Sequence, residues 1–273
     1  MRLPRAIDEV AAKLHVAGVT VRVVQDPDLS RHETGSYLWE EASEQLVNHV
    51  LLHCGGSASG FRFLDLGCGC GSVGNALALL GGCVTLTDVP ELLQNVRENI
   101  VANSEDIGNA GGHARAAALN WCDPLEGREA QLRSIGPLDV VVGSELLYAA
   151  ALNGDTHEPL ISTIAAAIDL SNSALRRLQP EPRPQPQPEP EPEPELRPED
   201  RHASGCSKQR ECVAILAGEY HFGYEDLFFE EAAAAGLHVE VLHKDSGTLK
   251  VLLVSRKTAK ETHCPVPYLP IAA

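Results

Sequence analysis

The stretch FRFLDLGCGCGSVG, residues 61–74, constrains the fold of this chain more than any other part of the sequence. It begins as a short apolar run, continues as a glycine loop and leads into a helix-like window at residues 72–80. Glycines let the backbone approach a ligand closely, and the N-terminus of the following helix offers unpaired N–H groups. The stretch therefore predicts an α/β fold with a loop for a nucleotide-like ligand.

Strand-like and helix-like patterns alternate along the rest of the chain. Buried parallel strands are expected in short apolar, β-rich runs, and helices in amphipathic windows. The last two strand-like runs are joined by a short DSG turn, which is a hairpin signature. The pattern predicts a Rossmann-like, doubly wound sheet that is mostly parallel and ends in an antiparallel hairpin. The expected strands are 61–66, 83–87, 116–120, 138–142, 212–218, 238–244 and 248–255, and the expected helices are 72–80, 90–102, 158–178 and 224–236.

One segment does not follow this alternation. Residues 179–200 contain nine of the 18 prolines, mostly at every second position, so they are expected to be extended and solvated. Neither side of this segment supplies a complete sheet by itself. We therefore expect a single domain over residues 1–273, with a core at about 18–255, a disordered insert at 179–210 and a tail at 256–273.

Charge and cysteine content narrow the class of partner. The 38 acidic and 22 basic side chains give a net charge of -16, which disfavours nucleic acid as a partner. The acidity favours either a cationic protein segment or simple solubility. The eight cysteines show no zinc-like spacing, and the chain has no apolar run long enough for a membrane span. We expect a reduced, cytoplasmic protein that does not bind metal, has no membrane partner and is a monomer.

The register of the glycine loop bears on the cofactor. Read from Gly69, the loop fits GxGxxG, which would suit a dinucleotide, although this motif alone is weakly specific. Read from Gly67, the loop has Asp65 two residues before its first glycine. A carboxylate at the loop mouth would repel a pyrophosphate and attract the amino group of S-adenosylmethionine. Asp88 ends the next strand and could accept ribose hydroxyls of either cofactor, or could cap the following helix.

Longer stretches resemble a known family. LDLGCGCGSVGNALALLGGCVTLTDVPELLQNVRENIVAN, together with GSYLWEEASEQLVNHV, LNW at 119–121 and GSELLY at 143–148, resembles the seven-β-strand methyltransferases. The combination is most similar to their protein-lysine branch, the methyltransferase-like twenty-one group. The resemblance covers residues 18–255 apart from the proline-rich insert, and it implies a seven-stranded sheet and S-adenosylmethionine as the cofactor.

The resemblance also implies which residues form the site. Trp39 and Trp121, the chain's two tryptophans, would contact the cofactor, although each would also suit ordinary core packing. Cys68 and Cys70 fit best as small loop fillers, whose thiols could make the site sensitive to oxidation. The implied cofactor contacts are Trp39, Asp65, the backbone of Gly67, Cys68 and Gly69, Asp88, Trp121 and Ser144.

The substrate side carries the main departure from the family pattern. The family has Asp at the start of a D-x-x-Y sequence, whereas this chain has Glu145 and then Tyr148, so the carboxylate reaches one methylene further. Glu145 would orient a lysine ammonium and Tyr148 would supply an oxygen to the amine, unless Tyr148 only packs a helix start. Tyr220 and His221 could rim the substrate entrance.

These observations lead to one main function and two alternatives. The main expectation is an S-adenosylmethionine-dependent methyltransferase that acts on a lysine side chain of a non-histone protein. The alternatives are a nicotinamide-dependent oxidoreductase that uses Gly69, Gly71 and Gly74, and a cofactor-binding scaffold whose proline-rich arm recruits partners.

Overall fold

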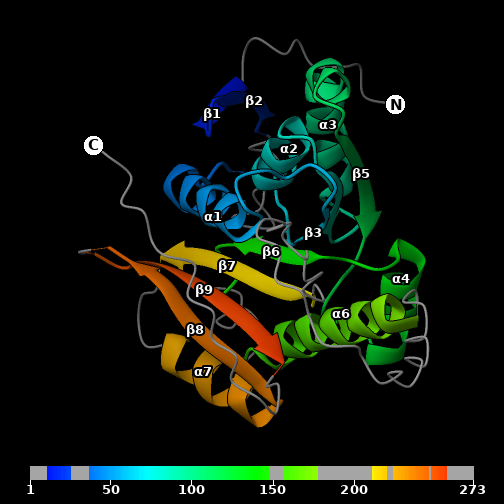
Figure 1. The fold of residues 1–273 in the computed structure, drawn as a ribbon, viewed down its shortest axis with the longest axis vertical. Coiled ribbons are helices and arrows are strands. Elements are labelled where there is room, and N and C mark those ends of the chain that lie inside the picture. Colours follow the sequence, from blue (N-terminus) through cyan, green and yellow to red (C-terminus); the bar gives the residue numbers. More distant parts are fainter. Residues whose placement is uncertain are drawn as a thin grey trace, which may run out of the picture.

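The computed structural model describes residues 11–25, 37–147, 156–177, 211–219, 224–245 and 247–256. These residues form a seven-stranded sheet, a separate two-stranded hairpin and helices on both faces of the sheet (Figure 1). Among the described residues, no helix is both long and apolar enough to cross a membrane.

The sheet has the strand order β5-β4-β3-β6-β7-β9-β8. Its first five strands are parallel, and β9 runs antiparallel to both β7 and β8. The expected doubly wound sheet with a C-terminal antiparallel hairpin is therefore confirmed. The strands of this sheet are β3 (Arg62–Leu66), β4 (Cys83–Asp88), β5 (His113–Ala118), β6 (Val140–Ser144), β7 (Val213–Glu219), β8 (Leu237–Lys244) and β9 (Leu249–Arg256).

Helices cover the sheet in two layers (Figure 1). On one face, Phe63 and Val84 pack with the apolar sides of the first three helices, and on the other face Leu64 packs with those of the last three. This arrangement follows from strands whose successive side chains point to opposite faces. The first layer contains α1 (Glu40–His53), α2 (Ser72–Leu79) and α3 (Leu93–Asn109), and the second contains α4 (Leu125–Ile135), α6 (Glu158–Arg177) and α7 (Tyr224–Ala234).

A hairpin of β1 (Ala11–Val16) and β2 (Val19–Val24) was not expected from the sequence. Its turn places Ala17 and Gly18 at positive φ, 48° and 81°, which is the geometry of a two-residue hairpin turn. Alternating apolar residues on both sides of this Ala-Gly pair were the signal that could have revealed it.

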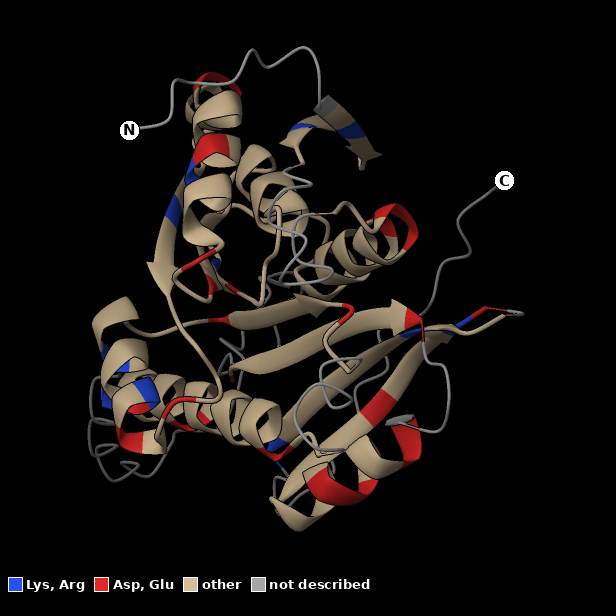
Figure 2. Cartoon of the chain, turned by 180° about the vertical axis from the view of Figure 1, so that it is seen from behind, with Lys and Arg blue, Asp and Glu red and all other residues tan. Residues whose placement is uncertain are grey.

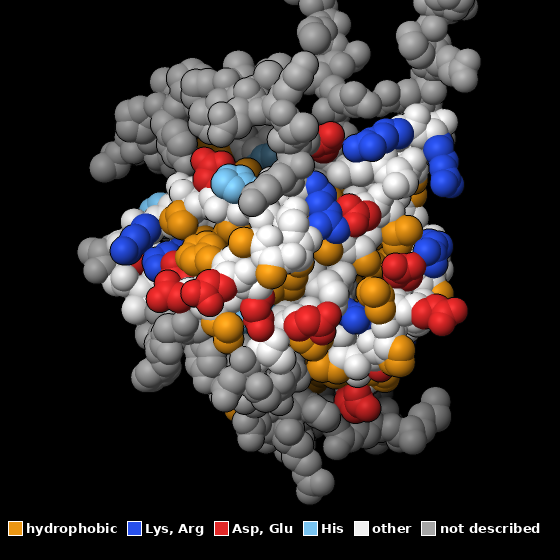
Figure 3. Space-filling view, turned by 90° about the horizontal axis from the view of Figure 1, so that it is seen from below, with side chains coloured by type: hydrophobic (Ala, Val, Ile, Leu, Met, Phe, Trp, Pro, Cys, Tyr) orange, Lys and Arg blue, Asp and Glu red, His pale blue; other side chains and the backbone are white. Residues whose placement is uncertain are grey.

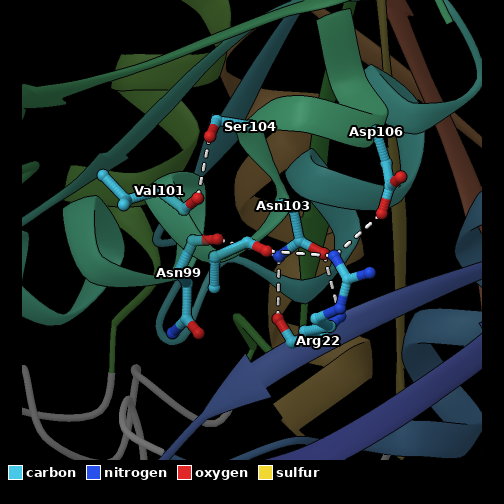
Figure 4. Close-up of polar contacts among 7 residues, drawn as sticks. Arg22, Asn99, Val101, Asn103, Ser104 and Asp106 are labelled. Carbon is cyan, nitrogen blue, oxygen red and sulfur yellow. Dashed lines mark hydrogen bonds and ion pairs between the residues drawn. The ribbon is translucent and has the colours of Figure 1, made fainter. Parts of the chain in front are cut away.

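Two asparagines of α3 hold the hairpin to the main domain, and Figure 4 shows the contacts of one of them, Asn103, with Arg22. The Asn103 side chain accepts a hydrogen bond from the backbone N–H of Arg22 (2.9 Å) and donates one to its carbonyl (2.8 Å). Asn99 forms the same pair of bonds with the backbone of Val24. The Arg22 side chain adds an ion pair with Asp106 at 2.8 Å. The amides thus satisfy backbone groups of β2 that have no partner strand.

Two helices differ from the sequence expectation, one in its bounds and the other because no helix was expected there. The helix expected at 90–102 is α3, which begins at Leu93 and continues to Asn109. Helix α4 had not been expected, because it is short and carries few apolar residues that would mark a buried face. Both differences arise in polar sequence, where apolar periodicity gives little information.

The proline-rich insert lies outside the described residues, but its flanks are described. The Asn172 side chain of α6 accepts a hydrogen bond from the backbone N–H of Cys212 at 2.7 Å. Arg176 and Glu211 form an ion pair at 4.0 Å. The chain therefore leaves α6 and returns to the start of β7 at nearly the same place.

Candidate active site

The candidate site lies where the carboxyl ends of β3, β4 and β6 meet, next to the end of β5. Strand β3 is central here, since it pairs with β4 on one side and with β6 on the other, and the chain order reverses between them. Open α/β sheets bind ligands at such a reversal point. The loop at 67–71 follows β3 directly, Asp88 and Ser144 are the last residues of β4 and β6, and Glu145 comes next after Ser144. Trp121 lies shortly after the end of β5 at Ala118.

The glycine loop closes tightly over the sheet. Gly67, Gly69 and Gly71 have φ values of 63°, 57° and 76°, a region that residues with a side chain rarely adopt. A Cβ atom on Gly74 would lie 2.6 Å from Leu86 Cγ and 2.8 Å from Asp65 Oδ2. The glycine at 74 thus lets α2 begin in direct contact with the strands beneath it.

Asp65 lies beneath the loop. Its side chain is 1% exposed, and Oδ2 accepts a hydrogen bond of 2.8 Å from the backbone N–H of Gly74. Burial raises the pKa of Asp65 to about 7, although the Gly74 bond opposes this and Asp88 adds to it. The sequence interpretation put this carboxylate at the loop mouth, but the first turn of α2 covers it.

Asp88 joins the loop to the end of β4. Its Oδ2 accepts a hydrogen bond from the backbone N–H of Gly69 (2.7 Å), and its Oδ1 accepts one from that of Val89 (2.8 Å). Helix α3 begins later, with Leu92 at its N-cap and no side-chain cap, so Asp88 does not cap this helix. The carboxylate therefore fixes the loop backbone beside the strand end.

The two tryptophans lie in different surroundings. A Cβ atom on Gly67 would lie 2.7 Å from the six-membered ring of Trp121 and 2.9 Å from Leu146 Cδ2. Trp121 therefore lies on the glycine loop and is half-buried against the second core layer. Trp39 is at the N-cap position of α1, and 45% of its surface is exposed. An exposed aromatic ring of this size is unusual for a residue whose role is core packing.

Ser144 and Glu145 form the turn after β6. The Ser144 hydroxyl is buried and has no hydrogen-bond partner among the described residues. Glu145 has φ 58°, a left-handed conformation that costs free energy in a residue other than glycine. Its backbone N–H donates to the Ala217 carbonyl (2.8 Å), and its Oε1 accepts from the backbone N–H of Glu219 (2.9 Å). The turn is thus held against the end of β7.

The thiols of the loop are shielded. Burial raises the pKa of Cys70 to about 11 and that of Cys68 well above the ordinary range. The Cys70 thiol donates to the Tyr37 carbonyl at 3.5 Å. Because the thiolate is the reactive form, these shifts run against the sensitivity to oxidation that the sequence suggested.

Several expected contributors lie outside the described residues, namely Tyr148, Tyr220 and His221. Leu146 is a residue of the site that sequence reasoning missed. It is buried, and its side chain lies close to both Gly67 and Gly143. The sequence feature that could have indicated Leu146 was its position shortly after the end of the strand and next to Leu147. Within the described part of the chain, no group of three or more His, Cys, Asp or Glu residues could hold a metal ion.

Comparison with known proteins gives partial matches to protein-lysine methyltransferases. The chain is 29% identical over 132 residues to protein-lysine N-methyltransferase rrg1 of Schizosaccharomyces pombe, covering 48% of this chain and 43% of that protein. It is 37% identical over 89 residues to mouse EEF1A lysine methyltransferase 3, covering 33% and 34%. It is 28% identical over 147 residues to zebrafish METTL21A, a protein N-lysine methyltransferase, covering 52% and 60%. The matches thus span less than two thirds of each relative.

Solved structures show distant likenesses only. The Thermus thermophilus 16S rRNA N2 G1207 methyltransferase RsmC, in complex with AdoMet and guanosine, aligns with a TM-score of 0.48 at 17% identity, covering 90% of this chain and 50% of that one. A TehB-like methyltransferase from Corynebacterium glutamicum aligns with a TM-score of 0.44 at 17% identity, covering 84% and 93%. Likenesses this distant do not bear on function.

The family match is more extensive. The sequence matches the lysine methyltransferase family over residues 26–180, more than half of the 273 residues. This range includes the glycine loop and the strand ends that carry Asp88, Trp121, Ser144 and Glu145. The match confirms the resemblance inferred from the sequence motifs. The chain therefore belongs to the lysine methyltransferase family.

Proposed function

We propose that this protein transfers a methyl group from S-adenosylmethionine to a lysine side chain of another protein. The observation that carries the proposal is that the family match includes all the strand ends that meet at the candidate site. A nicotinamide-dependent reaction is not favoured, because the family match assigns this glycine loop to methyltransferases.

The residues present suit S-adenosylmethionine. The buried Ser144 hydroxyl has no hydrogen-bond partner in the described part of the chain and could bond to a ligand. Asp88 is held in place by two backbone N–H groups, and a carboxylate can accept further hydrogen bonds from ribose hydroxyls. Trp39 has an exposed ring, and the carbonyl of nearby Tyr37 accepts a hydrogen bond from Cys70 in the glycine loop, which supports a role for Trp39 at the site. We assign cofactor contacts to these residues, to Trp121 and to the Gly67–Gly69 backbone, and an indirect contribution to the buried Asp65. When bound, the cofactor supplies an electrophilic methyl group.

The protein must present a lysine amine to this methyl group in its uncharged form. A lysine ammonium has a pKa of about 10.4, so it has to lose a proton before it can attack. Glu145 follows β6 directly, and we propose that it attracts and orients the ammonium and that Tyr148 supplies an oxygen to the amine. Positioning of the two reactants then provides much of the rate enhancement.

A protein substrate agrees with the charge of the chain and with the relatives. The net charge of -16 favours a cationic partner, and the mouse relative is named as an EEF1A lysine methyltransferase. Acidic side chains are prominent on α7 (Figure 2). Acidic, basic and apolar side chains are interspersed over the face in Figure 3, where no broad basic field is present among the described residues. We propose the cytoplasm as the place of action, since the six cysteines in the described residues are all free thiols.

Glu145 has two separable contributions, and substitutions can distinguish them. One is structural, because Oε1 accepts the Glu219 N–H bond. The other is the negative charge that would attract the substrate. Glu145→Gln keeps an acceptor oxygen but removes the charge, whereas Glu145→Ala removes both. We expect both variants to reduce transfer by at least about tenfold, because the hydrogen bond alone does not replace the charge.

The function itself is tested by binding and transfer. Calorimetry with S-adenosylhomocysteine and, separately, with NAD identifies the cofactor, and tritiated methyl transfer into cell-extract proteins identifies the acceptor by mass spectrometry. We expect binding of S-adenosylhomocysteine and label on lysine. Binding of NAD alone would refute the proposal, and tight cofactor binding without any transfer would favour the scaffold alternative. Full activity of Glu145→Gln would remove the charge of Glu145 from the mechanism.

A further inference from the structure

A buried histidine contacts the turn that carries Ser144 and Glu145. His157 lies just before α6, is 1% exposed, and has its Nε2 3.0 Å from the backbone carbonyl oxygen of Leu147. A carbonyl oxygen can only accept, so Nε2 must carry the proton and donate. Burial lowers the pKa of His157, which favours the neutral ring with a single proton. The bond therefore fixes both the tautomer and the position of the Leu147 carbonyl.

A second residue holds His157 in place from another element. Glu231 of α7 accepts hydrogen bonds from the backbone N–H of His157 and from the Thr156 hydroxyl, each at 2.7 Å. The rings of His157 and Phe228 of the same helix pack in a T-shaped arrangement, with centroids 5.5 Å apart. His157 Nδ1 is 3.5 Å from Glu231 Oε2, which is too long for a strong hydrogen bond. Helix α7 thus orients the imidazole, and the imidazole orients the turn.

The described part of the turn is also held at other points. Glu145 is bound to β7 at its backbone N–H and at Oε1, and its strained φ of 58° would relax if those bonds were lost. Leu146 packs on Gly67 in the cofactor loop. The Leu147 carbonyl is the next point along the chain at which the turn is held. Movement here would displace Leu146 from the loop and Ser144 from the cofactor.

We propose that His157 is a positioning residue for methyl transfer: its hydrogen bond to the Leu147 carbonyl, with Glu231 as its support, holds the turn of residues 144–147 in the geometry that binds the cofactor and presents Glu145. The inference rests on the proposed function, but it concerns a residue outside the motifs by which the family is recognised here. It also connects α7, on the far face of the sheet, to the site.

Two substitutions of similar size separate this role from simple packing. Gln places its amide nitrogen near the position of His Nε2 and can donate to Leu147, whereas Asn is one methylene shorter and cannot reach it. Both remove the aromatic ring, so both should lower the unfolding temperature to a similar degree. We expect His157→Gln to bind S-adenosylhomocysteine within about threefold of the unmodified protein and His157→Asn to bind at least fivefold more weakly, roughly the effect of one hydrogen bond.

The experiment compares these variants in the full chain. Calorimetry with S-adenosylhomocysteine measures affinity, and tritiated methyl transfer into cell-extract protein measures rate, which we expect to fall in parallel for His157→Asn. His238→Gln, an exposed histidine on β8, is the control for loss of an imidazole. Glu231→Gln should weaken binding less than His157→Asn, because its amide oxygen can still accept one of the two bonds.

The outcomes also distinguish this inference from the proposed function. Equal affinities for the Gln and Asn variants at equal stability would overturn the positioning role, and so would full affinity of both. If the unmodified protein did not bind S-adenosylhomocysteine, the proposed function would fail. Hydrogen exchange of a peptide covering residues 140–147 would then still test the inference. We expect faster exchange in His157→Asn only, and equal exchange in the two variants would overturn it.

Discussion

At the scale of single residues, the two aspartates of the site are used differently although they lie on neighbouring strands. Asp88 has both oxygens bonded to backbone N–H groups at the edge of the loop. Asp65 is buried and has one such bond, to Gly74. A buried carboxylate with so little compensation prefers to be protonated, which explains its raised pKa of about 7. The loop is therefore built over a group that titrates near neutral pH.

This leads to an expected pH dependence of stability. Because the folded protein raises the pKa of Asp65 from 3.8 to about 7, its protonation stabilises the fold fully below pH 3.8, and this contribution is lost as the pH rises to about 7. Without cofactor, the free energy of unfolding should fall between pH 5 and pH 8, and Asp65 should account for on the order of 2 to 3 kcal/mol of that fall. Urea denaturation at both pH values measures this difference.

Asp65→Asn is the informative variant. Asparagine can still accept the Gly74 bond but cannot ionise, so its stability should fall less between pH 5 and pH 8. Asp123→Asn, at a less buried aspartate outside the loop, serves as the control. If Asp65→Asn kept the pH dependence of the unmodified protein, the assignment of that dependence to Asp65 would be wrong.

At the scale of elements, α3 presents three asparagines at intervals of four residues, and they have different environments. Asn99 and Asn103 bind the backbone of β2, as described above. Asn95, one turn earlier, is 2% exposed, and neither its Oδ1 nor its Nδ2 has a hydrogen-bond partner within the described ranges of the chain. An unsatisfied buried amide destabilises a fold, whereas a satisfied one supports it. Substitution of these asparagines should therefore change the stability of the protein in opposite directions, although all three lie on one helix.

Leucine has nearly the shape of asparagine and tests this difference. Asn99→Leu and Asn103→Leu leave an N–H and a carbonyl of β2 without partners, and each should destabilise the protein by about 1 to 3 kcal/mol. Asn95→Leu should be neutral or stabilising. Chemical denaturation of the three variants measures the effect, with Asn95→Leu as the matched control. A loss in Asn95→Leu as large as in Asn99→Leu would show that Asn95 has a partner after all.

At the scale of the whole molecule, the segment between α6 and β7 joins two points that already lie together. The bond between Cys212 and Asn172 and the ion pair between Arg176 and Glu211 hold the two flanks. We expect that replacing residues 180–208 with a linker of eight Gly and Ser residues leaves the fold intact. Loop-closure entropy should make the shortened chain equally stable or roughly 1 kcal/mol more stable.

Thermal unfolding and S-adenosylhomocysteine binding of the shortened chain test this expectation. Unchanged binding and an equal or higher unfolding temperature would support the interpretation of residues 179–210 as an insert in one domain. A loss of several kcal/mol would mean that the segment contributes to the core.

How much of the structure could be predicted from the sequence also depends on scale. The sheet was predictable because buried strands such as 61–66 and 138–142 are continuous apolar runs and a glycine loop fixes where one of them ends. The hairpin of β1 and β2 was missed although apolar residues alternate on both sides of its Ala-Gly turn, and helix α4 was missed because it is short and carries few apolar residues. The placement of Asp65 was missed because its neighbours come from α2 and β4. No local sequence pattern around His157 indicated its contacts with Leu147 and Glu231.

The pairing of α3 with β2 has a consequence for which sequences can form it. Four residues of a helix advance about 6.0 Å and two residues of a strand about 6.6 Å, so asparagines four apart on a helix meet alternate residues of a strand with a mismatch of about 0.6 Å at each step. Each amide forms its hydrogen bonds to β2 with main-chain atoms, so these bonds do not depend on the side chains at positions 22 and 24, and proline at either position would remove the N–H donor. Such a contact can tolerate sequence drift in the strand, but the growing mismatch restricts it to a few successive steps.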